Sequence, residues 1–137
     1  MHLSIIVATL EGCSFERLDD PAFIEHLMNE AVRVGGFTML HSHVHRFEPQ
    51  GVTGAAVLTE SHIAVHTWPE NGTLFVDLAT CSGDEATRAA FDRICELIQH
   101  DRVIRRDIGY HGANRGAPSE MHVCTVERPR PPLRAVG

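Results

Sequence analysis

The chain has 137 residues, a formal charge of −6 at neutral pH and a sequence pI near 5.9. This is about the length of one domain with a single core, and it is short for an enzyme that must also enclose a substrate. The acidic balance argues against a nucleic-acid or anionic-membrane partner, because either needs a basic face to offset negative charge. We therefore expect a small-molecule ligand. A dimer with its site between the subunits would allow so short a chain to enclose a substrate.

The predicted elements begin with a strand and a helix. The apolar, β-branched run from Leu3 to Leu10 is typical of a buried strand. In the helix that follows, Asp19 or Asp20 can act as the cap and Pro21 suits the first turn. Gly35-Gly36 ends this helix, whose apolar residues recur on one face and must pack on a sheet.

Four more strands precede a second helix. They are predicted at Phe37–Phe47, Val52–Thr59, Ile63–Thr67 and Thr73–Thr80. Asn71-Gly72 is a strong hairpin signal between the last two of these strands. Ser82 or Asp84 is expected to cap the second helix, which has an apolar stripe that ends near Ile98.

Two further strands are predicted at Arg102–Tyr110 and Met121–Val126. The charged triplet Arg105-Arg106-Asp107 suggests that the first of them is an edge strand. The element order predicts an α/β (α+β) fold, a two-layer sandwich with one mainly antiparallel sheet and two helices on one face. Residues 1–127 are expected to form a single domain, and the proline-rich residues 128–137 a flexible tail.

The four cysteines have no CxxC pairing, and no segment resembles a signal peptide or a membrane span. We therefore expect a cytoplasmic protein with reduced thiols. Cys81 lies between a strand and a helix N-terminus that would stabilise a thiolate, which favours reactivity. Cys13, Cys95 and Cys124 are interpreted as small buried hydrophobic residues.

The stretch from Thr59 to Glu70 contains a serine, two histidines and two carboxylates within twelve residues. A tight bend at Glu60-Ser61 would make the serine hydroxyl an intramolecular nucleophile toward the carbonyl that precedes it. Proximity of this kind contributes up to about 7 to 11 kcal/mol in well-oriented systems. A base such as His66 could promote the shift of the Glu60 acyl group from nitrogen to oxygen. Loss of the Ser61 α-proton would then expel the Glu60 carboxylate and leave dehydroalanine, which hydrolyses to a pyruvoyl group.

Three motifs in the sequence resemble those of one known family. E-S-H-x-x-x-H-T-W-P-E runs from Glu60 to Glu70, V-D-x-x-T-C from Val76 to Cys81, and H-R-F-x-P-x-G-V-[ST]-G from His45 to Gly54. Over roughly residues 5 to 110 the chain resembles the bacterial and archaeal S-adenosylmethionine decarboxylase proenzymes. The resemblance implies a self-processing, pyruvoyl-dependent decarboxylase that supplies the aminopropyl donor for polyamine (spermidine) synthesis. It also implies a homodimer of processed two-chain protomers.

The resemblance also implies roles for individual residues. The chain would be cut between Glu60 and Ser61, and Ser61 would become the pyruvoyl cofactor that forms a Schiff base with the substrate. His66 matches the histidine that assists processing, and Cys81 the general acid that returns a proton after CO2 leaves. Thr53 stands where the family commonly has a serine that aids processing.

Three more positions match substrate-pocket residues of the family. Phe47, Trp68 and Glu70 would supply an aromatic ring to stack on adenine and a carboxylate for the ribose hydroxyls or the sulfonium. The family usually continues P-E-Y-G-Y where this chain has Asn71 and Thr73. That departure bears on substrate identity, and a pyruvoyl-dependent decarboxylase of ornithine or arginine is the alternative.

Another alternative is a non-enzymatic metal-binding or regulatory homologue. His41, His43 and His45 alternate along a predicted strand and therefore face one way, a spacing that a metal site could use. No carboxylate or cysteine pattern completes such a site, and we assign no metal. His62 is interpreted as a structural hydrogen-bonding residue. On an uninterrupted strand Ser61 and His66 would face opposite ways, so either the chain bends near Ser61 or His66 approaches the scissile bond from beneath.

Overall fold

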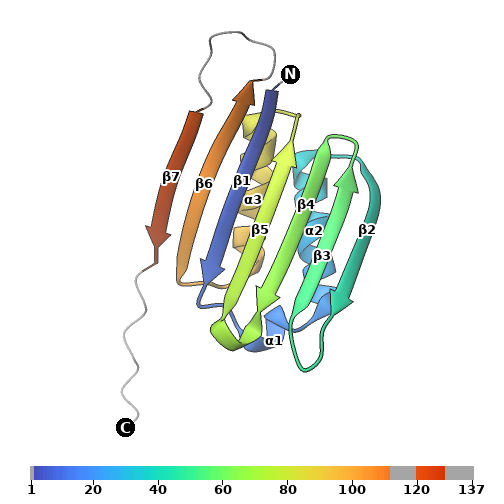
Figure 1. Cartoon of the computed structure of the whole chain (residues 1–137), viewed down its shortest axis with the longest axis vertical. Helices are drawn as coiled ribbons and strands as arrows, with labels where there is room; N and C mark the ends of the chain where they lie inside the picture. Colours follow the sequence, from blue (N-terminus) through green and yellow to red (C-terminus); the bar gives the residue numbers. More distant parts are fainter. Residues whose placement is uncertain (1, 112–119, 129–137) are drawn as a thin grey trace.

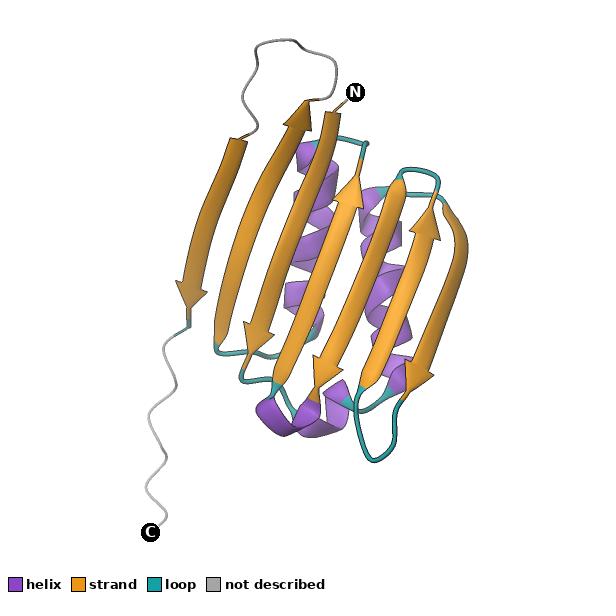
Figure 2. Cartoon of the chain, in the orientation of Figure 1, coloured by secondary structure: helices purple, strands orange, loops and turns teal. Residues whose placement is uncertain are grey.

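Seven strands form one sheet in the order β2-β3-β4-β5-β1-β6-β7 in the computed structural model, which describes residues 2–111 and 120–128. Every neighbouring pair is antiparallel. The strands are β1 (His2–Glu11), β2 (Met39–Arg46), β3 (Val52–Leu58), β4 (Ser61–Trp68), β5 (Thr73–Thr80), β6 (Arg102–His111) and β7 (Glu120–Glu127). The predicted two-layer sandwich is confirmed, since the long helices lie on one face of this sheet (Figures 1 and 2).

Two long helices, α2 (Pro21–Gly35) and α3 (Asp84–Leu97), form the second layer. A short helix α1 (Phe15–Leu18), which the sequence did not predict, lies between β1 and α2. Of the two expected caps of α2, Asp20 is the correct one, because its carboxylate accepts the Ala22 and Phe23 amides. The expected cap of α3 is wrong. Gly83 occupies the N-cap position with φ 104° and offers no side chain, because Asp84 is already the first helical residue.

The core lies between the sheet and the two helices. Side chains on one face of each central strand are buried, as Ile63 and Val65 are on β4 and Leu74 and Val76 are on β5. Gly54 on β3 permits close approach of α2, because a Cβ at this position would lie 2.9 Å from the Met28 methyl carbon. The elements that carry the motifs are therefore held rigidly from the helical side.

The expectation that Arg102–Tyr110 forms an edge strand is wrong. β6 pairs with β1 on one side and β7 on the other. The sheet accommodates its charges because Arg105 and Asp107 bind each other in two hydrogen bonds of 2.6 and 2.8 Å. Cys124 on β7 is exposed rather than buried, because no helix covers this strand. The predicted tail lies outside the described residues except for Arg128.

The second face of the sheet bears no helix (Figure 2). On β4 the side chains of His62, Ala64, His66 and Trp68 alternate with the buried set and therefore lie on this open face. Thr53 and Val57 on β3 and Phe75 and Asp77 on β5 do the same. We call this surface the open sheet face. Within the described residues, no helix is long and apolar enough to cross a membrane.

Candidate active site

The Glu60–Ser61 peptide bond lies at a tight hairpin between β3 and β4. Leu58 pairs with Ser61, so only Thr59 and Glu60 form the connection. Ser61 has φ 146°, and it is the one non-glycine residue with positive φ in the described segments. A side-chain-bearing residue held in such a region costs roughly 1–3 kcal/mol. The bend expected at this bond is therefore present, and it strains the backbone of the serine itself.

Both ends of Glu60 are held by hydrogen bonds. The Cys81 amide donates to the Glu60 carbonyl at 3.0 Å. The Glu60 carboxylate accepts the Thr38 amide at 3.2 and 3.1 Å. Burial acts to raise the pKa of Glu60, but hydrogen bonds from Thr38, from the Thr59 side chain and from its own amide lower it overall. The Glu60 carbonyl thus has a fixed donor of the kind that stabilises a developing oxyanion.

The Ser61 hydroxyl has a histidine beside it. Its Oγ lies 3.4 Å from His62 Nδ1, and His62 Nε2 lies 3.3 Å from the Asp77 carboxylate. Asp77 comes from the neighbouring strand β5, two positions from Ala79, which pairs with His62. His62 therefore makes the hydrogen bonds that the sequence suggested for it, and it makes them to the predicted nucleophile.

Cys81 lies where the sequence placed it, directly after β5 and three residues before the first residue of α3. Its thiol is exposed. By contrast, burial is the main cause that raises the pKa of Cys13 and of Cys95 to about 12. Cys81 is thus an accessible thiol, and its amide binds the Glu60 carbonyl at the hairpin.

His66 lies apart from Ser61 within this chain. The bend precedes Ser61, and the five residues onward to His66 run as regular strand, a separation of about 16 Å at about 3.3 Å per residue. His66 Nδ1 is 2.9 Å from the Thr53 hydroxyl. Its ring centroid is 6.4 Å from that of Trp68 and 6.0 Å from that of Phe75. The predicted site residues thus form two clusters at opposite ends of β4.

The predicted pocket residues belong with the His66 cluster. Phe47 is 47% exposed and its ring meets that of His45 edge to face, with centroids 4.7 Å apart. Trp68 is 43% exposed. Glu70 accepts a hydrogen bond of 3.4 Å from Gln50. These side chains lie near the far end of β4 from Ser61, and Trp68 is the one whose ring adjoins that of His66.

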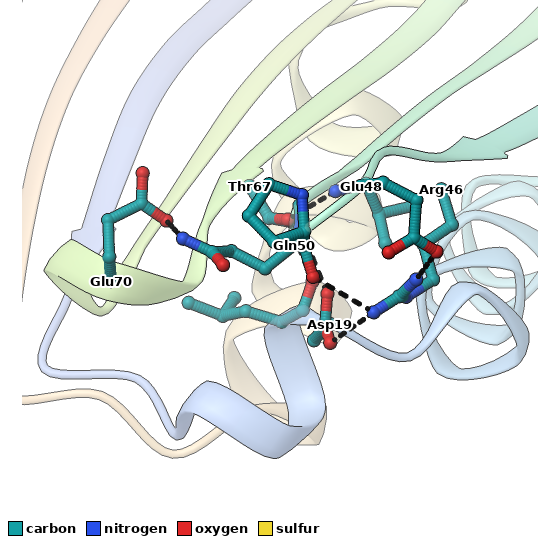
Figure 3. A network of polar contacts seen from close by, with 10 residues as sticks. Asp19, Arg46, Glu48, Gln50, Thr67 and Glu70 are labelled. Atoms are coloured by element: carbon teal, nitrogen blue, oxygen red, sulfur yellow. Dashed lines mark hydrogen bonds and ion pairs between the residues drawn. The ribbon is translucent and has the colours of Figure 1, made fainter.

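A polar network supports this end of the sheet (Figure 3). Arg46 donates to Asp19 at 3.0 Å, to Glu48 at 2.7 Å and to the Pro49 carbonyl at 3.2 Å. Asp19 also accepts the Gly51 amide at 2.9 Å, and this bond, followed by that from Arg46, lowers its pKa. The loop that carries Phe47 is therefore fastened to the end of α1.

His41, His43 and His45 lie exposed on the open sheet face, as their alternation predicts. In residues 2–111 and 120–128 there is no group of three or more His, Cys, Asp or Glu side chains that could hold a metal ion.

Two features of the site were not predicted from the sequence. Asp77 lies inside the V-D-x-x-T-C motif, and its alternation with the apolar Val76 and Leu78 would have placed it on the face opposite the core, which also carries His62. The partnership of Asp19 with Arg46 carries no local signal, because 27 residues separate the two.

Comparison with known proteins gives one consistent result. Residues 4–109 match the model of the family described as S-adenosylmethionine decarboxylase. An S-adenosylmethionine decarboxylase proenzyme from Parasynechococcus marenigrum is 49% identical over 131 residues, which cover 96% of this chain and 95% of that protein. One from Persephonella marina is 40% identical over 98 residues, or 72% and 74% of the two chains. The crystal structure of the adenosylmethionine decarboxylase from Aquifex aeolicus superimposes with a TM-score of 0.73 at 33% identity, covering 77% of this chain and 87% of that one.

Proposed function

The chain belongs to the S-adenosylmethionine decarboxylase family, and from this premise we propose that it is made as a proenzyme that cuts itself between Glu60 and Ser61. Cleavage would give chains of 60 and 77 residues, counted from the bond position in a sequence of 137 residues. The observation that carries the proposal is the strained Ser61 at φ 146°, next to a carbonyl already bound by the Cys81 amide. Strain raises the energy of the uncut bond, and the amide stabilises the charge that develops when the bond is attacked.

Ser61 is converted to the pyruvoyl group in this proposal. The residues fit that conversion, because the hydroxyl adjoins the hairpin and the Thr38 amide holds the side-chain carboxylate of Glu60, the residue whose main-chain carboxylate departs. A pyruvoyl group supplies a carbonyl that accepts the electrons released when a carboxylate leaves an α-amino acid. Cys81, exposed beside the hairpin, is the proton donor that completes the reaction.

S-adenosylmethionine is the proposed substrate, and decarboxylating it supplies the aminopropyl donor for spermidine synthesis. The relatives at 40 to 49% identity are named for this substrate, which favours it over ornithine or arginine. Phe47 and Trp68 present exposed rings suited to adenine, and the Glu70 carboxylate suits ribose hydroxyls or the sulfonium. Asn71 and Thr73 follow this group in sequence and are the positions at which the chain departs from the usual family pattern.

A homodimer is part of the proposal. His66 and Thr53 lie about 16 Å along the strand from Ser61 of the same chain, so a second chain is needed to bring the two clusters together. The open sheet face carries exposed apolar side chains, among them Val57, Trp68 and Tyr110, and it has no helix over it. We propose that two open sheet faces pack together and that His66 and Thr53 of one subunit act beside Ser61 of the other.

We also propose that the enzyme works in the cytoplasm. All four cysteines lie within the described residues and are free thiols, the state that a reducing compartment maintains.

Release of CO2 from carboxyl-labelled S-adenosylmethionine, ornithine and arginine tests the function. We expect release from S-adenosylmethionine by the wild-type protein and none by Ser61→Ala, with Ser82→Ala as the control that removes a nearby hydroxyl. Release only from ornithine or arginine would sink the assignment of substrate. Equal release by Ser61→Ala would sink the pyruvoyl chemistry.

A further inference from the structure

The hydroxyl of Ser61, the ring of His62 and the carboxylate of Asp77 lie in line. Ser61 Oγ is 3.4 Å from one ring nitrogen of His62, and the other ring nitrogen is 3.3 Å from Asp77 Oδ1. We propose that His62, oriented by Asp77, is the base that activates Ser61 for self-cleavage. The inference rests on the proposed function and adds the group that takes the first proton.

Strand register explains how the three side chains meet. His62 and Asp77 both lie on the open sheet face, on the adjacent strands β4 and β5. The residue directly opposite His62 is Ala79, whose methyl group leaves room for the imidazole to lean diagonally toward Asp77. Ser61 is the first residue of β4, and its positive φ is not that of a regular strand. In this conformation its hydroxyl lies beside the ring of the next residue, His62.

The carboxylate fixes which nitrogen of His62 can act as a base. A carboxylate at neutral pH only accepts hydrogen bonds, so Asp77 selects the tautomer with hydrogen on Nε2. Nδ1 then carries a lone pair directed at the Ser61 hydroxyl, and that hydroxyl donates to it. Both distances are longer than strong hydrogen bonds, which is common for catalytic groups before the reacting geometry forms. The arrangement has the acid–base logic of a serine, histidine and aspartate triad.

Each proton and bond of the step is accounted for. The Ser61 hydroxyl proton passes to His62 Nδ1 while Oγ bonds to the Glu60 carbonyl carbon, whose oxygen becomes negative and is held by the Cys81 amide. The carbon–nitrogen bond then breaks as His62 returns the proton to the departing Ser61 nitrogen. The product is an ester between Glu60 and Ser61 Oγ with a free amine on Ser61. His62 ends as it began.

His62 and His66 have separable roles in this scheme. His62 reaches the hydroxyl of its own chain, whereas His66 lies about 16 Å along the same strand and bonds to Thr53. On β3 the residue opposite His62 is Val57, which does not titrate, and His41 pairs with Val57 from the far side. Among these neighbours Asp77 is the charged group that adjoins the ring.

The test follows cutting of full-length chains made by cell-free synthesis, with samples resolved by mass over time. We expect His62→Gln to cut at least about 10²-fold more slowly than wild type, the usual loss when a general base is removed. Asp77→Asn should cut more slowly than wild type and faster than His62→Gln. In Asp77→Asn, nitrogen NMR of the His62 ring should show loss of the Nε2-protonated tautomer. His43→Gln, on the same face two strands away, is the control and should cut at the wild-type rate.

Two further measurements separate a chemical role from a structural one. Added imidazole should restore cutting of His62→Ala and leave Ser61→Ala uncut. Hydroxylamine cleaves esters, and we expect it to release less fragment from His62→Gln than from wild type, because the ester forms more slowly. Cutting of His62→Gln at the wild-type rate, no rescue by imidazole, or accumulation of ester in His62→Gln would each overturn the inference. A wild-type chain that never cuts would instead overturn the proposed function.

Discussion

Glu30 on α2 links the two long helices, because its carboxylate forms an ion pair with Arg93 of α3. Its carboxylate accepts hydrogen bonds from Arg33 of the same helix at 2.6 and 3.2 Å and from Arg93 of α3 at 3.3 and 2.8 Å. Arg33 and then Arg93 are the main causes that lower the pKa of Glu30 from 4.5 to about 2. A carboxyl group with a lowered folded-state pKa stabilises the fold above its unfolded pKa and loses this contribution as the pH falls through the folded value.

We therefore predict that Glu30→Gln weakens the acid dependence of stability. Wild type should lose this contribution progressively between about pH 4.5 and about pH 2, and the variant should lose less over that window. Urea unfolding at pH 7, 4.5 and 3 measures the effect, with Glu25→Gln on the exposed side of the same helix as the control. Parallel stability curves for wild type and Glu30→Gln would contradict the role assigned to this residue.

Some single residues could be assigned from the sequence and others could not. Ser61 and Cys81 could be predicted as site residues because their motifs are contiguous, and in the structure the Cys81 amide binds the carbonyl that precedes Ser61. His62 was assigned only structural hydrogen bonding, because its partner Asp77 comes from another strand and register fixes that pairing. The predicted burial of Cys124 failed because strand alternation does not say whether a helix covers that part of the sheet.

In the proposed dimer, the two clusters of predicted site residues meet where the open sheet faces pack together. Ser61 lies at one end of β4 and His66 near the other, so each protomer would supply one cluster to each site. Packing two such faces antiparallel would place each Ser61 near the partner's His66. Exposed apolar side chains on this face make the packing favourable, at about 25 cal/mol per Å² of apolar surface removed from water.

Mixed dimers test this arrangement. We predict that Ser61→Ala and His66→Gln chains, each uncut when made alone, give cut His66→Gln chains when made together, because the Ser61→Ala subunit supplies the missing histidine. Sedimentation of the wild-type protein should give twice the protomer mass. His66→Gln chains that stay intact in the mixture, or that cut normally alone, would rule out action across the subunit interface.

The strands and helices follow from periodicity in the sequence, and their bounds differ from expectation by a few residues. The position of β6 in the sheet did not follow, since a pair such as Arg105 and Asp107 neutralises charges that otherwise suggest an edge. The hairpin that Asn71-Gly72 predicted is present, since β4 and β5 pair antiparallel on either side of it, but the sequence did not predict that Pro69–Asn71 forms a short 3-10 helix (η1) ended by Gly72 in the left-handed region. Proline at its first position favours this turn of helix.

In the whole molecule, the strained backbone of Ser61 lies at the same hairpin as the bond proposed to be cut. The two helices hold one face of the sheet, and the hairpin at Glu60–Ser61 ends two strands that are fixed by that packing. Because the fold holds the bend rigidly, the energy stored at Ser61 is available to the reaction rather than lost by relaxation. In the proposed reaction the fold thus acts as a scaffold that directs the Glu60–Ser61 peptide bond toward cleavage.

The mass of the purified wild-type protein under denaturing conditions tests this account most directly. We predict two chains, residues 1–60 and residues 61–137, with the second carrying a pyruvoyl group in place of its N-terminal serine, and a single intact chain for Ser61→Ala. A wild-type protein that remains one chain of 137 residues, with an unmodified serine at position 61, would contradict the account.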